Sequence, residues 1–369
     1  MKIIADQTIP YLKGIVEPYA DIQYLPSSQF CPEKIKDAEV LIVRSIDKCN
    51  EELLKKSQVK LITTATIGFD HIDINYCDTH GIIWKNAPGC NAASVGQYIG
   101  SCLAHTSIRT QTLLAGKTIG IIGAGHVGKE VAKVCKGLGL KVLLNDPPRA
   151  EKEGSDHFVT LETIGKEADI ITLHTPLNKT GKYATFHLAD ENFFNKLQRK
   201  PWFINAARGS IHQTDALLSA KKTGKISEII LDCWENEPFI DPELLSVTSI
   251  ATPHIAGFSA DGKANATRIC LENIEAFYGI HIEGINKISL PIPVNPIIDM
   301  DLFKDYRIEQ ALLSTFNPIR IDEAFRSHPE KFEWFRANYD HPREYRAYSL
   351  IHGTPLENKI GKELGFTIL

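Results

Sequence analysis

A glycine-rich turn between two apolar stretches constrains the fold of this chain more than any other feature. The letters GAGHVG occupy residues 123–128, directly after the β-branched run at residues 118–122, and a helical pattern follows from about residue 127 to 136. Gly123, Gly125 and Gly128 allow a tight turn, the close approach of the backbone to a pyrophosphate, and the packing of the helix on the strand. The segment therefore predicts a dinucleotide-binding βαβ unit within a parallel sheet.

Asp146 indicates which dinucleotide this unit binds. It closes the next predicted strand, 18 residues after Gly128, where a carboxylate can accept hydrogen bonds from the adenosine ribose. At about 4 Å from a 2′-phosphate, its charge would cost on the order of 4 kcal/mol at an effective dielectric of 20, roughly a thousandfold in affinity. We therefore expect NAD rather than NADP. Arg149 is close enough in sequence to weaken this preference, and the prolines between the two residues leave its direction open.

Short apolar runs recur along the chain with helical or polar stretches between them, an alternation typical of parallel sheets with right-handed crossovers. A first series lies at residues 2–5, 22–25, 40–43, 61–64 and 82–84, and a second at 118–122, 142–144, 170–173, 202–204, 229–231 and 249–251. Helices are expected at residues 94–104, between the two series, and at 263–278, where the chain returns to the first. We predict two doubly wound α/β domains with a ligand cleft between them: residues 1–95 with a return helix in 258–285, and residues 96–257.

The character of the sequence changes after residue 280. A proline-rich stretch at residues 290–296 cannot continue a helix and predicts an extended linker. Beyond it, residues 305–315 and 321–328 are predicted as helices and residues 344–351 as a strand. The aromatic content of this tail argues against disorder. Residues 286–369 are therefore expected to form a small α+β domain.

Composition excludes several classes of function. The formal net charge of −4 and the pI near 6.4 give no basic surface for nucleic acid, and no stretch approaches the roughly 18 uninterrupted apolar residues of a membrane span. The first residues turn polar too soon for a signal peptide, so a cytoplasmic location is expected. The eight cysteines show no C-x-x-C pair and no zinc-like spacing with histidine, which predicts reduced thiols and no metal site.

Polar segments follow the last three predicted strands of the second series, and they contain Arg208, Glu237 and His254. Ligands bind at the carboxyl ends of the strands in an open α/β sheet, so these side chains are expected beside the nicotinamide. Taken singly, a surface arginine, a solvated carboxylate and a histidine in a turn are ordinary features. Their succession at strand ends favours a functional role.

These residue types suit the oxidation of a 2-hydroxy acid, which removes a hydride from carbon 2 and a proton from its hydroxyl. We expect His254 to take the proton, because imidazole titrates near neutrality. Glu237 is expected to fix the histidine tautomer and to stabilise the imidazolium. Arg208 supplies a forked cation for the substrate carboxylate and the reacting oxygen, a role that lysine fills poorly.

The order of these motifs resembles the D-2-hydroxyacid dehydrogenase family over about residues 1 to 280. Segments at residues 87–91, 145–149, 232–238 and 252–257 are similar to a branch of that family that oxidises 4-phosphoerythronate on the route to pyridoxal phosphate. The tail resembles the dimerisation domain of that branch. The resemblance implies a flavodoxin-like substrate domain, a Rossmann NAD domain, an NAD-dependent oxidation and a homodimer.

The resemblance also implies site residues. Arg208, Glu237 and His254 match the catalytic positions. Cofactor contacts are implied for Gly123, Gly125, His126, Val127, Gly128, Asp146, Thr175, Ala206, Arg208, Asp232 and Gly257. Substrate contacts are implied for Arg44, Ser45, Thr66, Gly68 and Phe258, with Arg44 as a phosphate ligand. Phe258 stands where the branch is expected to have a tyrosine, so one substrate contact lacks its hydroxyl.

A substrate phosphate needs more positive charge than Arg44 supplies, because Arg208 is reserved for the carboxylate. Arg343 and Arg346 lie in a tyrosine-rich stretch whose composition suits a partly buried interface. We predict that the tail builds a homodimer and that Arg346 adds a cation to the phosphate site. The alternatives are arginines that only tie subunits together and a contribution from Arg320, Arg326 or Arg336.

Two other functions fit the same motifs. One is a different dehydrogenase of the family, such as a 3-phosphoglycerate or D-lactate enzyme, which would differ mainly in the substrate pocket and the tail. The other is an NAD-sensing binding protein, like the corepressors of this family. Those corepressors also keep the catalytic trio, so the trio does not exclude this function. The sequence shows no long charged or disordered appendage for recruiting partners, which argues against the second.

Overall fold

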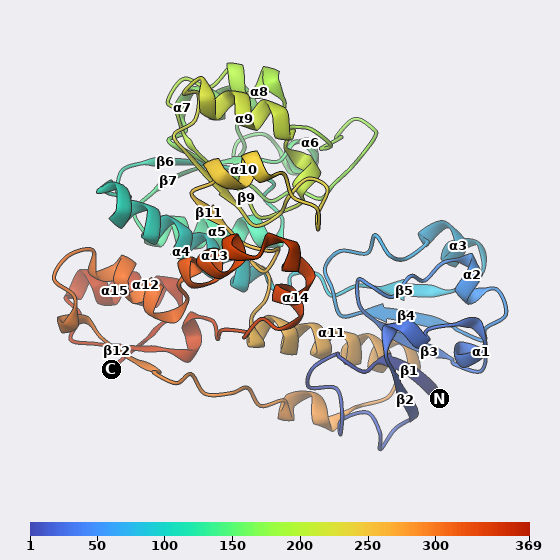
Figure 1. The fold of residues 1–369 in the computed structure, drawn as a ribbon. Coiled ribbons are helices and arrows are strands. Elements are labelled where there is room, and N and C mark those ends of the chain that lie inside the picture. Colours follow the sequence, from blue (N-terminus) through green and yellow to red (C-terminus); the bar gives the residue numbers. More distant parts are fainter. The chain divides into compact units, whose positions relative to one another are not determined.

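The computed structural model describes residues 1–369, which divide into two compact units (Figure 1). The first unit comprises Met1–Asn91 and Ser259–Pro291, and the second comprises Ala92–Phe258 and Ile292–Leu369. Both are built on parallel sheets with helices, which confirms the predicted α/β class. Most of the tail falls in the second unit, and the three-domain division with its boundaries stays a prediction.

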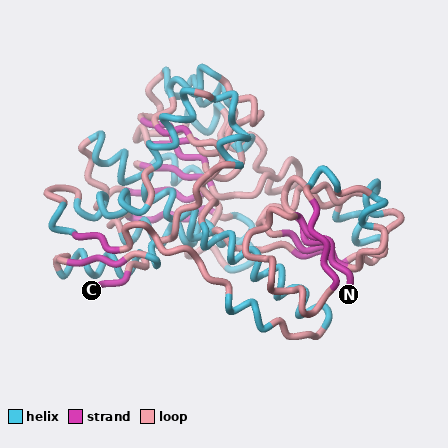
Figure 2. The backbone as a smooth tube through the Cα atoms, turned by 60° about the horizontal axis from the view of Figure 1, so that its bottom comes forward, coloured by secondary structure: helices cyan, strands magenta, loops and turns pink.

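A five-stranded parallel sheet forms the centre of the first unit, in the order β2-β1-β3-β4-β5. Its strands are among the magenta segments near the N-terminus in Figure 2. Its strands are β1 (Lys2–Asp6), β2 (Asp21–Leu25), β3 (Val40–Val43), β4 (Leu61–Thr64) and β5 (Ile83–Lys85). The helices of this unit are α1 (Pro32–Ile35), α2 (Glu51–Leu54), α3 (Ile74–Thr79) and α11 (Ala260–Tyr278). Strands β3 and β4 are buried along their whole length, as continuous apolar runs in a sheet covered on both faces should be. Helix α11, the predicted return helix, packs on β4.

The second unit contains a six-stranded parallel sheet in the order β11-β10-β9-β8-β6-β7. Its strands are β6 (Thr118–Ile122), β7 (Lys141–Asn145), β8 (Ile170–Leu173), β9 (Trp202–Asn205), β10 (Glu228–Leu231) and β11 (Ile250–Ala251). The chain passes from β6 to the edge strand β7 and then crosses back to β8 on the other side of β6. This reversal is a topological switch point, and doubly wound folds bind their ligands at the carboxyl ends of the strands there.

The helices of this sheet come from the segments between its strands. They are α4 (Ala92–Thr110), α5 (His126–Gly137), α6 (Pro147–Glu153), α7 (Leu161–Glu167), α8 (Glu191–Asn195), α9 (Thr214–Lys222) and α10 (Pro242–Val247). Helix α4 extends the helix predicted at residues 94–104 by two residues at its start and six at its end, and fourteen of its residues are buried. It is buried so extensively because α5 packs on it from one direction and the tail from another.

The tail adds a small parallel sheet and four helices. The sheet has the order β12-β13-β14, with β12 (Ile297–Asp299), β13 (Ser349–Ile351) and β14 (Thr367–Ile368). The helices are α12 (Arg307–Thr315), α13 (Pro318–Ser327), α14 (Phe332–Ala337) and α15 (Pro355–Leu364). Helix α12 packs on α4, and α15 packs on α5. The tail therefore shares one apolar core with the nucleotide-binding sheet.

The strand predicted at residues 344–351 is wrong in its first half. Only Ser349–Ile351 pair as β13, whereas Tyr345–Ala347 form a 3-10 turn. Tyr345 is buried, and its hydroxyl lies so close to α4 that a Cβ at Gly100 would be 2.7 Å from it. Packing onto α4 sets the turn, and local sequence does not reveal that packing.

Helix α13 closes the open edge of the six-stranded sheet. Asp322 accepts a hydrogen bond from the amide of Ala251, on edge strand β11, at 2.5 Å. Arg326 forms a forked ion pair with Asp322, with Nε–Oδ2 at 2.8 Å and Nη2–Oδ1 at 2.9 Å. The same guanidinium donates to the carbonyls of Leu245 and Thr248 at 2.7 and 2.6 Å. An edge amide that another molecule could pair with is thus satisfied within the chain.

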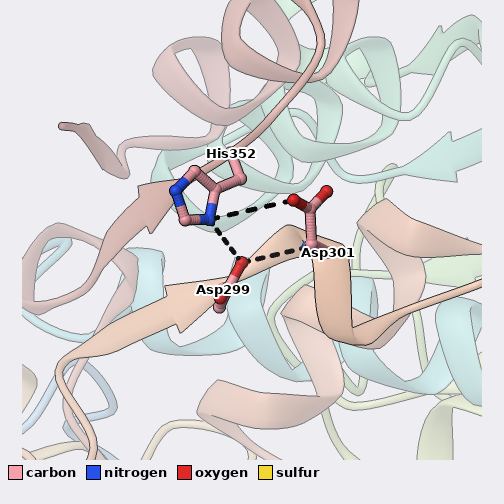
Figure 3. A group of neighbouring side chains, drawn as sticks. All are labelled: Asp299, Asp301 and His352. Carbon is pink, nitrogen blue, oxygen red and sulfur yellow. Dashed lines mark hydrogen bonds and ion pairs between the residues drawn. The ribbon is translucent and has the colours of Figure 1, made fainter.

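A side-chain contact also joins two strands of the small sheet (Figure 3). His352 Nδ1, just after β13, lies 2.9 Å from Asp299 Oδ1 at the end of β12 and 3.9 Å from Asp301 Oδ2. The hydrogen bond that His352 donates to Asp299, together with the charge of that carboxylate, raises the pKa of His352. Arg307 Nη2 lies 3.5 Å from the other oxygen of Asp301. His352 thus contacts both Asp299 and Asp301, and Arg307 contacts Asp301 as well. The contact between His352 and Asp299 connects the ends of β13 and β12.

None of the helices combines the length and the apolar character that crossing a membrane requires. The eight cysteines are free thiols, and seven of them are buried.

Candidate active site

The glycine turn at residues 123–128 has the shape of an anion-binding turn. Gly123 has a φ of 93°, and a Cβ there would lie 2.6 Å from the carbonyl carbon of His174 at the end of β8. A Cβ at Gly128 would overlap the carbonyl oxygen of Gly123. A Cβ at Gly125 would meet no heavy atom within 4 Å, so the N-terminus of α5 stays open to a phosphate group. His126 and Val127, also predicted as cofactor contacts, form the first turn of that helix.

Asp146 is anchored to this turn. Its Oδ2 accepts a hydrogen bond from the amide of Ala124 at 2.9 Å, and its Oδ1 accepts one from the amide of Arg149 at 3.1 Å. The carboxylate therefore stands at the carboxyl end of β7, beside the glycine turn, where the ribose of a dinucleotide would lie. Arg149 donates to the carbonyl of Ala124 and forms a forked pair with Glu153. Because the charge of Arg149 is already paired with Glu153, Arg149 does not favour the 2′-phosphate of NADP. The preference for NAD that Asp146 predicts therefore stands.

Thr175 gives an independent indication of a bound group. It follows β8, and its hydroxyl oxygen is buried without a hydrogen-bond partner in the protein. Buried polar groups are nearly always paired, so an unpaired hydroxyl at the carboxyl end of β8 indicates a partner from outside the protein. Together with the open space over Gly125, this fits a dinucleotide held by the turn, Asp146 and Thr175.

Asp232, just after β10, organises the turn that carries His254. It is fully buried, and it accepts hydrogen bonds from the Thr252 hydroxyl at 2.6 Å and from the amides of Ile255 and Ala256 at 2.8 and 2.9 Å. The amide of His254 donates to the Asp232 carbonyl at 2.8 Å. Burial raises the pKa of Asp232, against the lowering effect of the His254 charge and these hydrogen bonds. The network holds His254 at a left-handed φ of 55°.

His254 and Glu237 form the reactive pair of the site. Nδ1 of His254 lies 2.5 Å from Oε1 of Glu237, and each side chain is about one quarter exposed. The other carboxylate oxygen accepts from the amide of Trp234 at 3.2 Å. Burial alone would raise the pKa of Glu237, but the hydrogen bond and charge of His254 hold it below its ordinary value. An ionised Glu237 on Nδ1 leaves Nε2 as the nitrogen that can accept a proton.

The neighbouring Glu235 serves a different histidine. It accepts from His187 Nε2 at 2.5 Å and from the amide and hydroxyl of Thr214 at 3.0 and 2.8 Å. The two glutamates of the segment after β10 thus have separate partners. The geometry assigns the pairing with His254 to Glu237, the residue predicted for it.

Arg208 follows β9, the strand next to β10 in the sheet. A Cβ at the adjacent Gly209 would overlap the carbonyl oxygen of Trp234, so the loop bearing Arg208 lies directly against the loop bearing Glu237. Nη1 of Arg208 donates to the carbonyl of Ala207 at 2.8 Å. Arg208, Glu237 and His254 therefore come from the carboxyl ends of adjacent strands, as predicted.

The candidate substrate residues of the first unit also gather at strand ends. Arg44 and Ser45 follow β3, and Nε of Arg44 lies 3.4 Å from Oδ2 of the buried Asp6 at the end of β1. The amide of Arg44 donates to Asp47 at 2.7 Å, and burial raises the pKa of Asp47 to about 6. The guanidinium of Arg44 thus shares its charge with Asp6, which weakens it as a phosphate ligand.

Thr66 and Gly68 stand on the loop after β4. The Thr66 hydroxyl donates to the Gly68 carbonyl at 2.7 Å and lies 2.7 Å from the hydroxyl of Thr64. These bonds fix the loop and direct its amides. Their contact with a substrate stays a prediction.

The tail brings further side chains toward Phe258. The ring of Phe258 lies 6.3 Å from that of Tyr339 and 5.9 Å from that of His341, measured between centroids. Arg346 is 54% exposed, and its Nη2 lies 3.3 Å from Glu344. Its contribution to a phosphate site stays a prediction.

Sequence reasoning missed the supports of the site. Tyr98 on α4 shares a hydrogen bond with Thr252 at 2.7 Å, across 154 residues of sequence, and so extends the network of Asp232. The pairing of His187 with Glu235 was also missed. No local pattern marks either contact.

Comparisons with known proteins agree with this geometry. Residues 96–256 match the family described as "D-isomer specific 2-hydroxyacid dehydrogenase, NAD binding domain". The erythronate-4-phosphate dehydrogenase of Porphyromonas gingivalis is 48% identical, covering 99% of this chain and 100% of its own. That of Bacteroides thetaiotaomicron is 52% identical over 95% of this chain and 99% of its own.

Solved structures show the same fold. A D-lactate dehydrogenase from Aquifex aeolicus, complexed with NAD and lactic acid, has a TM-score of 0.61 at 26% identity, covering 78% of this chain and 97% of its own. The TT0316 protein of Thermus thermophilus has a TM-score of 0.65 at 23% identity, covering 77% and 99%. The chain therefore belongs to the D-isomer specific 2-hydroxyacid dehydrogenases, in the group of proteins named erythronate-4-phosphate dehydrogenase, and NAD is its cofactor.

Proposed function

We propose that the chain oxidises 4-phospho-D-erythronate to 2-oxo-3-hydroxy-4-phosphobutanoate with NAD, a step in the synthesis of pyridoxal 5′-phosphate. The names of relatives at 48% and 52% identity support this substrate. The observation that carries the chemistry is the 2.5 Å contact between His254 Nδ1 and Glu237 Oε1, in the same sheet as the glycine turn.

The chain's own residues account for the movement of the proton. Nε2 of His254 accepts the proton of the substrate's C2 hydroxyl, while Glu237 stabilises the imidazolium that forms. The turn at residues 123–128, Asp146 and Thr175 would hold NAD, which would supply the hydride acceptor for C2. Arg208 holds the substrate carboxylate with a forked pair of hydrogen bonds and so orients C2. Asp232 keeps the His254 turn in place through its bonds to the amides of Ile255 and Ala256.

A panel of 2-hydroxy acids tests this function. We expect NADH formation with 4-phosphoerythronate at a kcat/KM well above that with 3-phosphoglycerate, D-lactate or unphosphorylated erythronate. A higher kcat/KM with 3-phosphoglycerate or D-lactate would assign the chain to another activity of the family. NAD binding without turnover of any member of the panel would indicate a sensing protein.

The proposal includes a homodimer built by residues from about 290 onward. Large apolar side chains of the tail are well exposed, among them Leu302 at 77% and Trp334 at 56%, and these support an interface. Sedimentation of the full chain is expected to give the mass of a dimer, and Leu302→Glu is expected to weaken it. A monomer at micromolar concentration would contradict the proposal.

Arg346 is proposed to contribute charge to the phosphate site of this dimer. The Arg346→Ala variant should stay dimeric and lose efficiency only with the phosphorylated substrate. An equal loss with phosphorylated and unphosphorylated acids, or no loss, would contradict it.

We also propose a cytoplasmic location. The eight free thiols support it, because such thiols persist in a reducing compartment. Fractionation of cells, with the chain detected by antibody, would test this location, and recovery outside the cytoplasmic fraction would refute it.

A further inference from the structure

Arg336, on helix α14 of the tail, lies against the loop that carries His254. Its guanidinium carbon is 5.8 Å from the ring centroid of Phe258 and 5.9 Å from that of Phe332. Phe258 is four residues beyond His254 in the chain. The side chain of Arg336 is only 24% exposed, so these contacts fix its head group at the rim of the catalytic loop.

The guanidinium is only partly used by the protein. Nη1 lies 3.1 Å from both carboxylate oxygens of Glu333, which is 63% exposed. Nε is buried and has no hydrogen-bond partner. An exposed ion pair of this kind contributes little stability, so an anion with stronger acceptors can replace Glu333 at small cost. A buried donor without a partner points in the same direction, since such groups are rare in the absence of a ligand.

The charge of Arg336 reaches the reactive pair. It is one of the groups that hold the pKa of Glu237 below its ordinary value, after the hydrogen bond and charge of His254. Three other tail arginines have carboxylate partners: Arg326 with Asp322, Arg307 with Glu357 and Asp301, and Arg346 with Glu344. Arg336 is the tail cation that lies against Phe258, on the loop of His254, and whose charge also acts on Glu237.

We infer that Arg336 binds the phosphate of the substrate and thereby selects phosphorylated over unphosphorylated 2-hydroxy acids. This inference rests on the proposed function and deepens it. A phosphate offers several acceptor oxygens to a planar fork of donors, and Arg336 has such donors in its unpaired Nε and its exchangeable Nη1. Arg208 is committed to the carboxylate, and Arg44 shares its charge with Asp6. Arg336 supplies positive charge for the phosphate that these two do not, beside the contribution proposed for Arg346.

The test compares wild type, Arg336→Met and Arg336→Lys in kcat/KM with 4-phosphoerythronate and with erythronate. Methionine keeps an apolar side chain against the rings of Phe258 and Phe332 and removes the positive charge. Because a hydrogen bond to a charged group is worth roughly one to two decades in affinity, we expect a loss of about 10- to 100-fold with the phosphorylated acid. The loss with erythronate should stay within about twofold. Lysine should recover part of the loss, since it restores the charge without the fork.

A purely structural role would have a different signature. An equal loss of kcat/KM on both substrates would show that Arg336 acts by positioning Glu237 and His254, and would overturn the inference. No loss with either substrate would overturn it as well. The control is Arg199→Met, the same substitution at an arginine whose side chain is 53% exposed and pairs with Asp169, before β8; it should leave kcat/KM with both substrates unchanged.

Failure of the proposed function is recognised separately, in the wild type. If wild type fails to oxidise 4-phosphoerythronate, inorganic phosphate becomes the probe, as a competitive inhibitor of whichever hydroxy acid is turned over. We then expect the inhibition constant of phosphate to rise about 10-fold or more in Arg336→Met. An unchanged inhibition constant would refute the phosphate site whatever the substrate is.

Discussion

Replacing Glu237 by glutamine tests the proton-transfer pair most sharply. The substitution keeps the size of the side chain and a possible hydrogen bond to His254 Nδ1, but removes the charge that now lies 2.5 Å away. At about 4 Å between charge centres, a pair is worth about 4 kcal/mol at an effective dielectric of 20. Because the two side chains are 24% and 28% exposed, we take about 1.5–3 kcal/mol, the range of charge-assisted hydrogen bonds. Glu237→Gln should therefore lower kcat/KM by about 10- to 150-fold.

The same substitution should change the pH dependence of the rate. Without the carboxylate the imidazolium is less stable, so the acidic limb of the kcat/KM profile should move to lower pH, by about one to two units at 1.36 kcal/mol per unit. The assay is the initial rate of NADH formation across pH with a fixed buffer series. The matched control is Glu235→Gln, since that glutamate bonds His187 and not His254. An unmoved limb in Glu237→Gln, or the same movement in Glu235→Gln, would refute the assigned role.

The pair also links stability to pH. The folded-state pKa of Glu237 lies below the ordinary glutamate value, so its contribution to stability is complete above that ordinary value. The contribution is lost as the pH falls through the lower folded value. Acid should therefore destabilise wild type over this window more steeply than Glu237→Gln, measured by unfolding midpoints in urea. If the unfolding midpoints of wild type and Glu237→Gln fell in parallel as the pH is lowered, the predicted direction of the linkage would be wrong.

Further predictions concern the cofactor, the base and the tail. Asp146→Ala should weaken NAD binding and narrow the gap to NADP, measured as kcat/KM with each cofactor; equal efficiency with both in wild type would refute the assignment. His254→Ala should lose about 10²–10⁴ in rate while binding NAD nearly as wild type does, by fluorescence titration, and a comparable loss of NAD affinity would show a structural defect instead. Asp322→Ala leaves Arg326 and the Ala251 amide without their carboxylate partner, so it should lower the free energy of unfolding by about 3–5 kcal/mol. The control Glu323→Ala, at the exposed neighbouring residue, should lower it by about 0.5 kcal/mol. Equal effects of the last two variants would contradict the edge-closing role of Asp322.

The two sheets and the reactive residues could be predicted from sequence because local patterns encode them. Continuous apolar runs such as Val40–Val43 and Ile170–Leu173 mark strands buried on both faces, and the structure gives them the same bounds. The glycines at 123 and 128 mark places where a Cβ would collide with backbone. The chemistry then narrows the choice of site residues. The reaction needs a base, a carboxylate that supports it and an arginine for the substrate carboxylate, and all three are expected at the carboxyl ends of strands, where ligands bind.

The supports of the site could not be predicted, because they join residues that are far apart in sequence. The bond from the Ala251 amide to Asp322 spans 71 residues, and that between Gln97 and Thr315 spans 218. The placement of Arg336 beside Phe258 depends on how α14 packs, and sequence offered several other arginines for the same role. Short strands such as Thr367–Ile368 carry too few residues to show a period.

The central claim is that a hydride leaves C2 of the phosphorylated acid for NAD while His254 takes the hydroxyl proton. The most direct measurement uses 4-phosphoerythronate deuterated at C2 and follows the label in the reduced cofactor. We predict that the deuterium appears in the reduced nicotinamide of wild type, and that the His254→Ala variant transfers it about 10²–10⁴ times more slowly. Deuterium released to water, or retained in the oxidised product, would contradict the account.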